Sequence, residues 1–123
     1  FGLMVCYDLR FPELALTLRA RGANILTAPA AFTYTTGQMH WQLLLQARAM
    51  DSQSIVLGAA QQGWHGEKRQ TWGHAAATNS RGQVLDLILN PGAQLITVPF
   101  DLAEQVQIRE SMPLMQHRKL VQF

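Results

Sequence analysis

The stretch LMVCYDLRFPE, residues 3–13, holds the side chains of this sequence that best fit covalent chemistry. Cys6 is the only cysteine, and it ends a short apolar run that predicts a strand buried on both faces. A thiol at the end of a strand and before a helix could act as a nucleophile, because ligands and anions bind at such places. Free cysteine is also among the most buried residue types, so a packing role for Cys6 stays open.

Charged side chains surround the apolar Leu-Phe-Pro that follows Cys6. They are Asp8, Arg10 and Glu13, three charges within six residues. Asp8 or Glu13 could pair with an arginine and hold the turn, and we expect this of Glu13. Arg10 is the better binding candidate, because a guanidinium fork matches a substrate carboxylate and lies one turn from the thiol.

No local motif supplies a base for Cys6. A Cys-His hydrolase would need an imidazole next to the sulfur. We interpret each histidine as structural and keep a dyad of Cys6 with His40 or His74 as an open alternative; the other histidines are His65 and His117. The sequence has no P-loop, no glycine-rich dinucleotide motif and no His-x-x-x-His pair, so we expect no cofactor and no metal.

Alternating strands and helices must position these residues. Apolar runs predict strands at 3–6, 24–28 and 55–60, with a helix opened by Pro12 and ended by Gly22. A second helix follows a loop at 29–37, with Thr35 or Thr36 as its cap and an apolar stripe of Met39, Leu43, Leu44, Ala47 and Met50. This β-α-β-α-β order predicts an α/β fold with parallel strands.

The second half of the sequence changes character. A polar, glycine-punctuated loop is predicted at 61–73, and a tail without clear periodicity begins near Met112. Asp101 with Glu104 resembles a capping box, which predicts a helix that runs to about Arg109. Strands are predicted at 74–78, 83–89 and 94–100.

Composition narrows the class of protein. The 123 residues are 48% hydrophobic and 15% charged, which fits one soluble domain with a modest core. The net charge is +2 and the basic residues are scattered, so we expect no nucleic-acid partner. A single cysteine suits a reducing cytoplasm. No signal peptide and no apolar span of about 20 residues is present, so we expect no membrane association.

The segment VCYDLRFPE resembles the cysteine signature of the nitrilase superfamily, the carbon-nitrogen hydrolases. The resemblance continues through PAAFTYTTGQMHWQLLLQARAMDSQ, AAQQG, EKRQTWGH and MPLMQHRKL, and so covers nearly the whole chain. The later segments are most similar to the branch that includes deaminated glutathione amidase and omega-amidase-like enzymes. The resemblance implies the C-terminal part of a four-layer α-β-β-α sandwich.

The resemblance also implies a role for each site residue. Cys6 would be the nucleophile that attacks an amide carbon and forms a thioester. The backbone N–H of Tyr7, with a family lysine, would stabilise the oxyanion, and a family glutamate would act as general base. Arg10 would bind a carboxylate of the substrate, and Phe32 and Thr36 would line its pocket.

The family's glutamate and lysine precede the cysteine, and only five residues precede Cys6 here. We therefore expect residues 1–123 to be a partial carbon-nitrogen hydrolase domain that is inactive alone. The complete enzyme would release ammonia from the amide of a small carboxylate compound such as deaminated glutathione. It would need no cofactor and would form a homo-oligomer.

Departures from the branch pattern keep a second hypothesis open. Ala75 replaces the usual serine, and Asn79-Ser80 replaces the usual Asp-Pro. These departures, with the missing half, fit a truncated or degenerate remnant without catalysis. Lys68 and Arg69 could add positive charge near an anionic substrate, or simply lie in a solvated loop.

Overall fold

The apolar runs of the first half form parallel strands joined by helices, as their order predicts. The structure is a computed structural model that describes residues 1–119. Its elements in chain order are β1 (Gly2–Leu3), a 3-10 helix η1 (Cys6–Arg10), α1 (Pro12–Ala20), β2 (Ile25–Thr27), α2 (Tyr34–Ser52), β3 (Ile55–Gly58), β4 (Gln62–His65), β5 (Arg69–Trp72), β6 (Ala76–Thr78), β7 (Val84–Leu87), α3 (Leu102–Ser111) and α4 (Leu114–His117).

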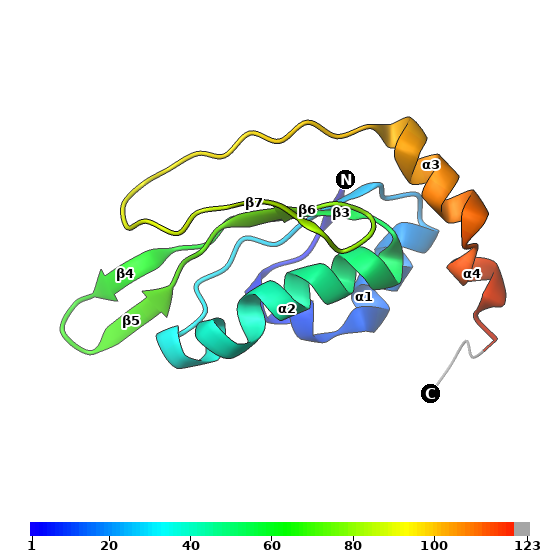
Figure 1. Ribbon diagram of the computed structural model, residues 1–123. Coiled ribbons are helices and arrows are strands. Elements are labelled where there is room, and N and C mark those ends of the chain that lie inside the picture. The colour runs from blue at the N-terminus through cyan, green and yellow to red at the C-terminus, as the bar shows by residue number, and fades with distance from the viewer. Residues whose placement is uncertain (120–123) are drawn as a thin grey trace.

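The strands form a five-stranded sheet in the order β1-β2-β3-β6-β7, and β4 with β5 forms a separate hairpin. β1, β2 and β3 are parallel, whereas β6 and β7 are antiparallel to their neighbours. The predicted α/β class and the parallel first half are therefore confirmed. Figure 1 shows the β4–β5 hairpin projecting from one end of the sheet, with α3 and α4 at the other end.

The helices α1 and α2 cover one face of the sheet (Figure 1). Leu26 of β2 and Val56 of β3 are fully buried there against Trp41 and Leu45 of α2. Gly58 permits this close packing, because a Cβ at that position would lie 2.8 Å from Cζ2 of Trp41. The core of the described chain thus lies between these two helices and the sheet.

The opposite face of the sheet is covered only in part. Leu3 is 72% exposed and Val5 is 58% exposed on the β1 side. The chain between β7 and α3 crosses above the sheet, away from α1 and α2 (Figure 1). Leu95, Ile96 and Val98 of this crossing line an apolar cavity of about 450 Å³. Two layers are therefore present among the described residues.

The predicted apolar stripe of α2 is wrong. Met39, Leu43 and Met50 are 59%, 65% and 55% exposed, and Leu44 and Ala47 are half-buried. The helix begins at Tyr34 and its N-cap is Thr33, not Thr35 or Thr36. The residues that it buries are Gly37, Trp41, Leu45, Arg48, Ala49 and Ser52. Two of these are polar, so the true inner stripe is less apolar than the outer one and the pattern favours the wrong face.

Other predicted elements also need correction. The first strand ends at Leu3, and Cys6 begins η1 instead of ending a strand. The predicted loop at 61–73 contains the β4–β5 hairpin, which its polar, glycine-containing sequence conceals. The predicted strand at 94–100 is absent from the described sheets, because this segment crosses over the sheet instead of extending its edge.

The predicted C-terminal helix is confirmed, and a further short helix follows it. Asp101 caps α3 by accepting a hydrogen bond from the N–H of Ala103 at 2.7 Å. The helix ends at Ser111, two residues beyond the prediction. Leu114–His117 then forms α4, where the sequence shows no periodicity.

Candidate active site

Cys6 lies where the parallel ladder of β1 and β2 ends. The N–H of Met4 donates to the carbonyl of Thr27, and the N–H of Cys6 donates to the carbonyl of Pro29, both at 2.9 Å. Cys6 itself is half-buried and has a backbone φ of +47°, in the left-handed region that side chains other than glycine rarely adopt. Such strain at a nucleophile-type residue is a common feature of reactive sites.

The turn after Cys6 is closed by Asp8. Its carboxylate accepts a hydrogen bond from the N–H of Val5 at 2.8 Å, and its own N–H donates to the Val5 carbonyl at 2.9 Å. This reciprocal pair fixes the first turn of η1. The N–H of Tyr7 makes no hydrogen bond within residues 1–119, so it is a free donor directly after the thiol.

Glu13 does not hold this turn, which corrects the expectation for that residue. Its side chain is exposed, and no arginine of the described chain lies within ion-pair distance of it. Asp8 closes the turn instead, because its short side chain lies three residues after Val5 and can bond to the Val5 N–H across a single 3-10 turn.

Arg10 projects from the end of η1 toward α2. Its Nη2 donates to Nδ1 of His40 at 3.1 Å. Its guanidinium carbon lies 5.8 Å from the ring centre of Tyr7 and 5.7 Å from that of Phe32, at the range of cation-π contacts. Arg10 therefore has neutral partners only, and its charge is left without an anion.

Phe32 and Thr36 take different positions. Phe32 is 8% exposed, and its ring lies edge-on to Trp41 with centroids 5.2 Å apart. It is part of the core and also supports Arg10. Thr36 is half-buried in the first turns of α2. The structure thus brings Arg10 and Phe32 together.

Three of the four histidines make side-chain hydrogen bonds away from the thiol. His40 accepts from Arg10, and His74 donates through Nδ1 to the carbonyl of Trp72 at 2.8 Å. His65 Nε2 and Thr71 Oγ1 are 2.7 Å apart. No hydrogen bond within residues 1–119 joins Sγ of Cys6 to an imidazole, so the Cys-His alternative has no support here.

The β4–β5 hairpin borders the same end of the sheet. The N–H of Trp72 donates to the carbonyl of Phe32 at 3.0 Å, and Thr33 pairs with Thr71 in an isolated bridge. Arg69 reaches back so that its Nη2 donates to the Ala31 carbonyl at 3.4 Å, whereas Lys68 is exposed at the turn. The hairpin is thereby tied to the loop that carries Phe32.

A cavity of about 490 Å³ lies beneath the hairpin. Its wall includes residues 59–62 after β3, residues 92–94 of the crossing, and the side chains of His65, His74 and Ala75. Ala59, Ala75, Ile88 and Gln94 line both this cavity and the apolar cavity of about 450 Å³. Pro29 also lines the apolar cavity. Pro29, whose carbonyl accepts from the N–H of Cys6, is the nearest link between that cavity and the thiol, because Cys6 itself lines neither cavity.

Sequence reasoning did not identify two of these features. They are the left-handed conformation of Cys6 and the pairing of His40 with Arg10. His40 and Arg10 are 30 residues apart, and no local pattern signals their contact. No group of three metal-binding side chains occurs among the described residues.

The sequence of this chain is similar to that of a known enzyme family. The family model for carbon-nitrogen hydrolase matches residues 1–110. Deaminated glutathione amidase of Yersinia enterocolitica is 46% identical over 98% of this chain and 42% of its own length. The chain spans less than half the length of the curated relatives that it matches.

Solved structures of related proteins superpose on this chain. The Caenorhabditis elegans NitFhit protein superposes with a TM-score of 0.87 at 41% identity, over 96% of this chain and 28% of that one. Saccharomyces cerevisiae Nit3, a member of branch 10 of the nitrilase superfamily, superposes with a TM-score of 0.88 at 32% identity. The match covers 98% of this chain and 44% of that one. The chain therefore belongs to the carbon-nitrogen hydrolase family, within the nitrilase superfamily.

Proposed function

We propose that Cys6 is the nucleophile of an amidase that releases ammonia from the amide of a small carboxylate compound. The observation that carries this proposal is the thiol on a left-handed backbone at a strand end, followed by the free N–H of Tyr7. Family membership supports carbon-nitrogen bond hydrolysis. The 46% identity to a deaminated glutathione amidase supports deaminated glutathione as the substrate.

The proposed reaction has two halves. Sγ of Cys6 attacks the amide carbon as its proton passes to a general base, and the carbonyl oxygen becomes an oxyanion that the Tyr7 N–H binds. The C–N bond breaks and the nitrogen leaves as ammonia after it takes up a proton. Water then attacks the thioester, which yields the carboxylic acid and restores the thiol.

Arg10 is the proposed clamp for the substrate carboxylate. Its guanidinium has no anionic partner within residues 1–119, and it is held by His40 and two aromatic rings. Phe32 is buried, so its part is to position Arg10, while the half-buried Thr36 lies closer to solvent as a pocket residue.

The general base and the lysine are placed outside residues 1–123 in this proposal. Two observations support a partial domain: the chain spans 42% of the length of the Yersinia relative, and Leu3 and Val5 are exposed on the partly open face of the sheet. A second layer of strands on that face would complete the four-layer sandwich.

Two of the departures from the branch pattern, Asn79 and Ser80, make side-chain hydrogen bonds, and the remnant remains the alternative that the experiment below decides. Asn79 Oδ1 accepts hydrogen bonds from the N–H groups of Arg81 and Gln83, both at 3.0 Å. Ser80 is buried, and its Oγ accepts from Nε2 of Gln105 at 2.8 Å. Both replacements thus make hydrogen bonds within the fold.

A homo-oligomer is the proposed assembly. The outward stripe of α2, formed by Met39, Leu43 and Met50, is more than half exposed and lies on one side of the helix. Sedimentation of the protein and of a Leu43→Glu variant tests this assembly: we expect the variant to have the lower mass.

The experiment for the function uses the protein with whatever in-frame sequence precedes Phe1 in its gene. Ammonia release is measured from deaminated glutathione and from a matched amide that lacks the carboxylate. We expect Cys6→Ala to abolish release, and Arg10→Gln to raise KM at least about ten-fold for the carboxylate substrate only. Equal activity of wild type and Cys6→Ala would refute the proposal. An early stop codon upstream of Phe1 would favour the remnant.

A further inference from the structure

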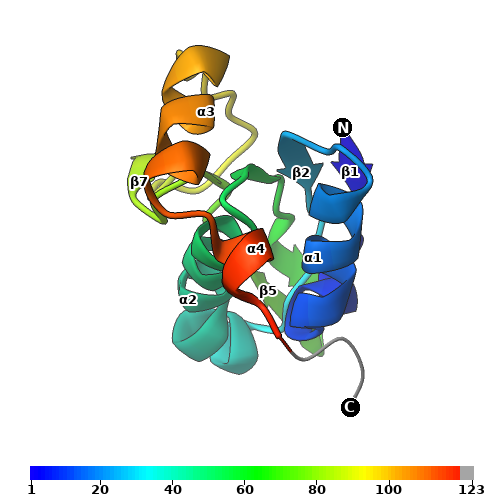
Figure 2. The same cartoon turned by 90° about the vertical axis from the view of Figure 1, so that its right-hand side faces the viewer.

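A cavity of about 490 Å³ lies at the end of the sheet opposite to Cys6. It is enclosed by the last turn of α1, the C-cap of α2, α3 and α4, and Figure 2 shows α4 beside α1 on this side. Arg19 and Arg109 line it together with Gln53 and Gln116. None of its lining residues belongs to the candidate active site.

The location follows from the sheet topology. Asn24 precedes β2, and Gln53 and Ser54 precede β3, so they mark the amino ends of the parallel strands. Cys6 follows β1 and marks the carboxyl ends. A ligand in this cavity would therefore bind far from the thiol, at the opposite end of the strands.

Arg109 is fixed in place by neutral oxygens. Its Nη1 donates to Oδ1 of Asn24 at 2.7 Å and its Nε donates to the Gln53 carbonyl at 3.1 Å. Nη2 makes a longer contact of 3.4 Å with Oγ of Ser54. These bonds orient the guanidinium but leave its charge uncompensated.

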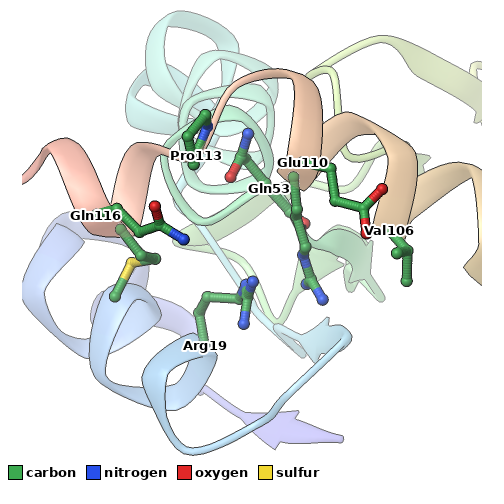
Figure 3. Close-up of a pocket in the computed structure, with 8 residues that line it drawn as sticks. Arg19, Gln53, Val106, Glu110, Pro113 and Gln116 are labelled. Atoms are coloured by element: carbon green, nitrogen blue, oxygen red, sulfur yellow. The ribbon is translucent and has the colours of Figure 1, made fainter.

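Arg19 has no such partners. Its Nε is enclosed from solvent and makes no hydrogen bond, which is a costly state for a charged donor. Within residues 1–119 no carboxylate lies within ion-pair distance of Arg19 or Arg109. Figure 3 shows the carboxylate of Glu110 on the Val106 side of the cavity, away from Arg19.

The two guanidinium groups also repel each other. Burial lowers the pKa of Arg109 to about 10, and the positive charge of Arg19 contributes to this lowering. Burial likewise lowers the pKa of Arg19. An anion between the two side chains would offset this repulsion.

We propose that this cavity binds the phosphate group of a small organic anion between Arg19 and Arg109. A phosphate monoester carries nearly two negative charges at neutral pH, which matches two guanidinium groups, and its oxygens accept from guanidinium forks in pairs. The volume is that of a small-molecule site and exceeds what a lone phosphate fills. The side-chain amide of Gln116 lies on the same wall.

Binding of inorganic phosphate and of ribose 5-phosphate tests this proposal, with ribose as the uncharged control. Titrations are followed by calorimetry at constant ionic strength, with chloride as the balancing anion. Arg19→Gln removes one guanidinium without breaking any hydrogen bond of the fold, whereas Arg109 anchors α3 and is unsuitable. Arg21→Gln is the matched control, because Arg21 is exposed two residues further on.

We expect saturable binding of both phosphates, weakened at least about ten-fold by Arg19→Gln and less than about two-fold by Arg21→Gln. Tighter binding of ribose 5-phosphate than of phosphate supports an organic phosphate, whereas equal or weaker binding of ribose 5-phosphate would contradict the organic part of the proposal. Absence of saturable phosphate binding, or equal affinities of the two variants, overturns it. Circular dichroism of each variant confirms that it is folded.

Discussion

Cys6 and Gln53 have nearly the same backbone conformation at opposite ends of the sheet. Their φ angles are +47° and +49°, and neither is glycine. At Gln53 the conformation ends α2: its N–H donates to the Ala49 and Met50 carbonyls, and its side chain donates to the Met112 carbonyl at 2.7 Å. At Cys6 the side chain has no hydrogen-bond partner within residues 1–119, and the next N–H is free.

The difference shows what strain means in this fold. A left-handed residue at a helix C-cap is a common structural device, and the N–H, the carbonyl and the side-chain amide of Gln53 all make hydrogen bonds within the fold. The same strain at Cys6 leaves a thiol and the N–H of Tyr7 unused by the fold. Cys6 therefore differs from Gln53 in that its own side chain and the N–H that follows it are left unused.

Removal of the arginine that anchors the structural end should have the largest effect on stability. Arg109→Met loses the bonds to Asn24 and to the Gln53 carbonyl, so we expect the free energy of unfolding to fall by about 2–3 kcal/mol. Urea denaturation measures this change. Arg118→Met, at an exposed position, is the control and should change it by less than about 0.5 kcal/mol. Equal losses in the two variants would contradict the structural role of Arg109.

Glycine substitutions compare the strain at the two ends directly. Cys6→Gly should be more stable than Cys6→Ala by about 1 kcal/mol, because only glycine adopts this conformation without cost. Gln53→Gly should likewise be more stable than Gln53→Ala, by a similar amount. Thermal melting of the four variants checks both differences. If alanine were the more stable residue at position 6, the strain at the nucleophile would be disproved.

The smallest effect is expected for Arg19→Gln. Because the pKa of Arg109 is lowered in the folded state, the folded chain binds that proton less tightly than the unfolded chain. The lowered pKa therefore reduces the stability of the folded state at neutral pH, and this loss of stability decreases as the pH rises through about 10. Removal of the Arg19 charge should therefore raise stability at pH 7 by about 0.5 kcal/mol, with a smaller gain above pH 10. A loss of stability at pH 7 would oppose this account.

The sequence predicts local features better than it predicts contacts. Pro12 opens α1 and Asp101 caps α3, because both act within one helical turn. The sequence also predicts Cys6 at a strand end just before a turn into a helix, and the family resemblance implies its role as nucleophile. It does not reveal that His40 holds Arg10 or that Phe32 is buried, since both depend on how α2 packs against η1.

The errors have a common physical origin. α2 has an apolar stripe on its exposed side and buries Arg48 and Ser52, so periodicity alone selects the wrong face. Segment 94–100 has the composition of a strand, yet it crosses above the sheet and leaves Leu95 91% exposed. In both cases tertiary packing overrides a local pattern, and the outcome depends on surfaces that the pattern does not describe.

No helix among residues 1–119 combines the length and the apolar character that crossing a membrane requires.

The most direct test of the account is acylation of Cys6 by p-nitrophenyl acetate. This activated ester needs no general acid for its leaving group, so the test isolates the thiol and the Tyr7 N–H from groups outside the chain. Intact-mass analysis and peptide mapping follow the acetyl group in the folded protein and in urea. We predict acetylation of Cys6 that is at least about ten-fold faster in the folded protein and absent from Cys6→Ala. Equal rates in the two states, or acetylation at other residues only, would contradict the assignment of Cys6 as the nucleophile.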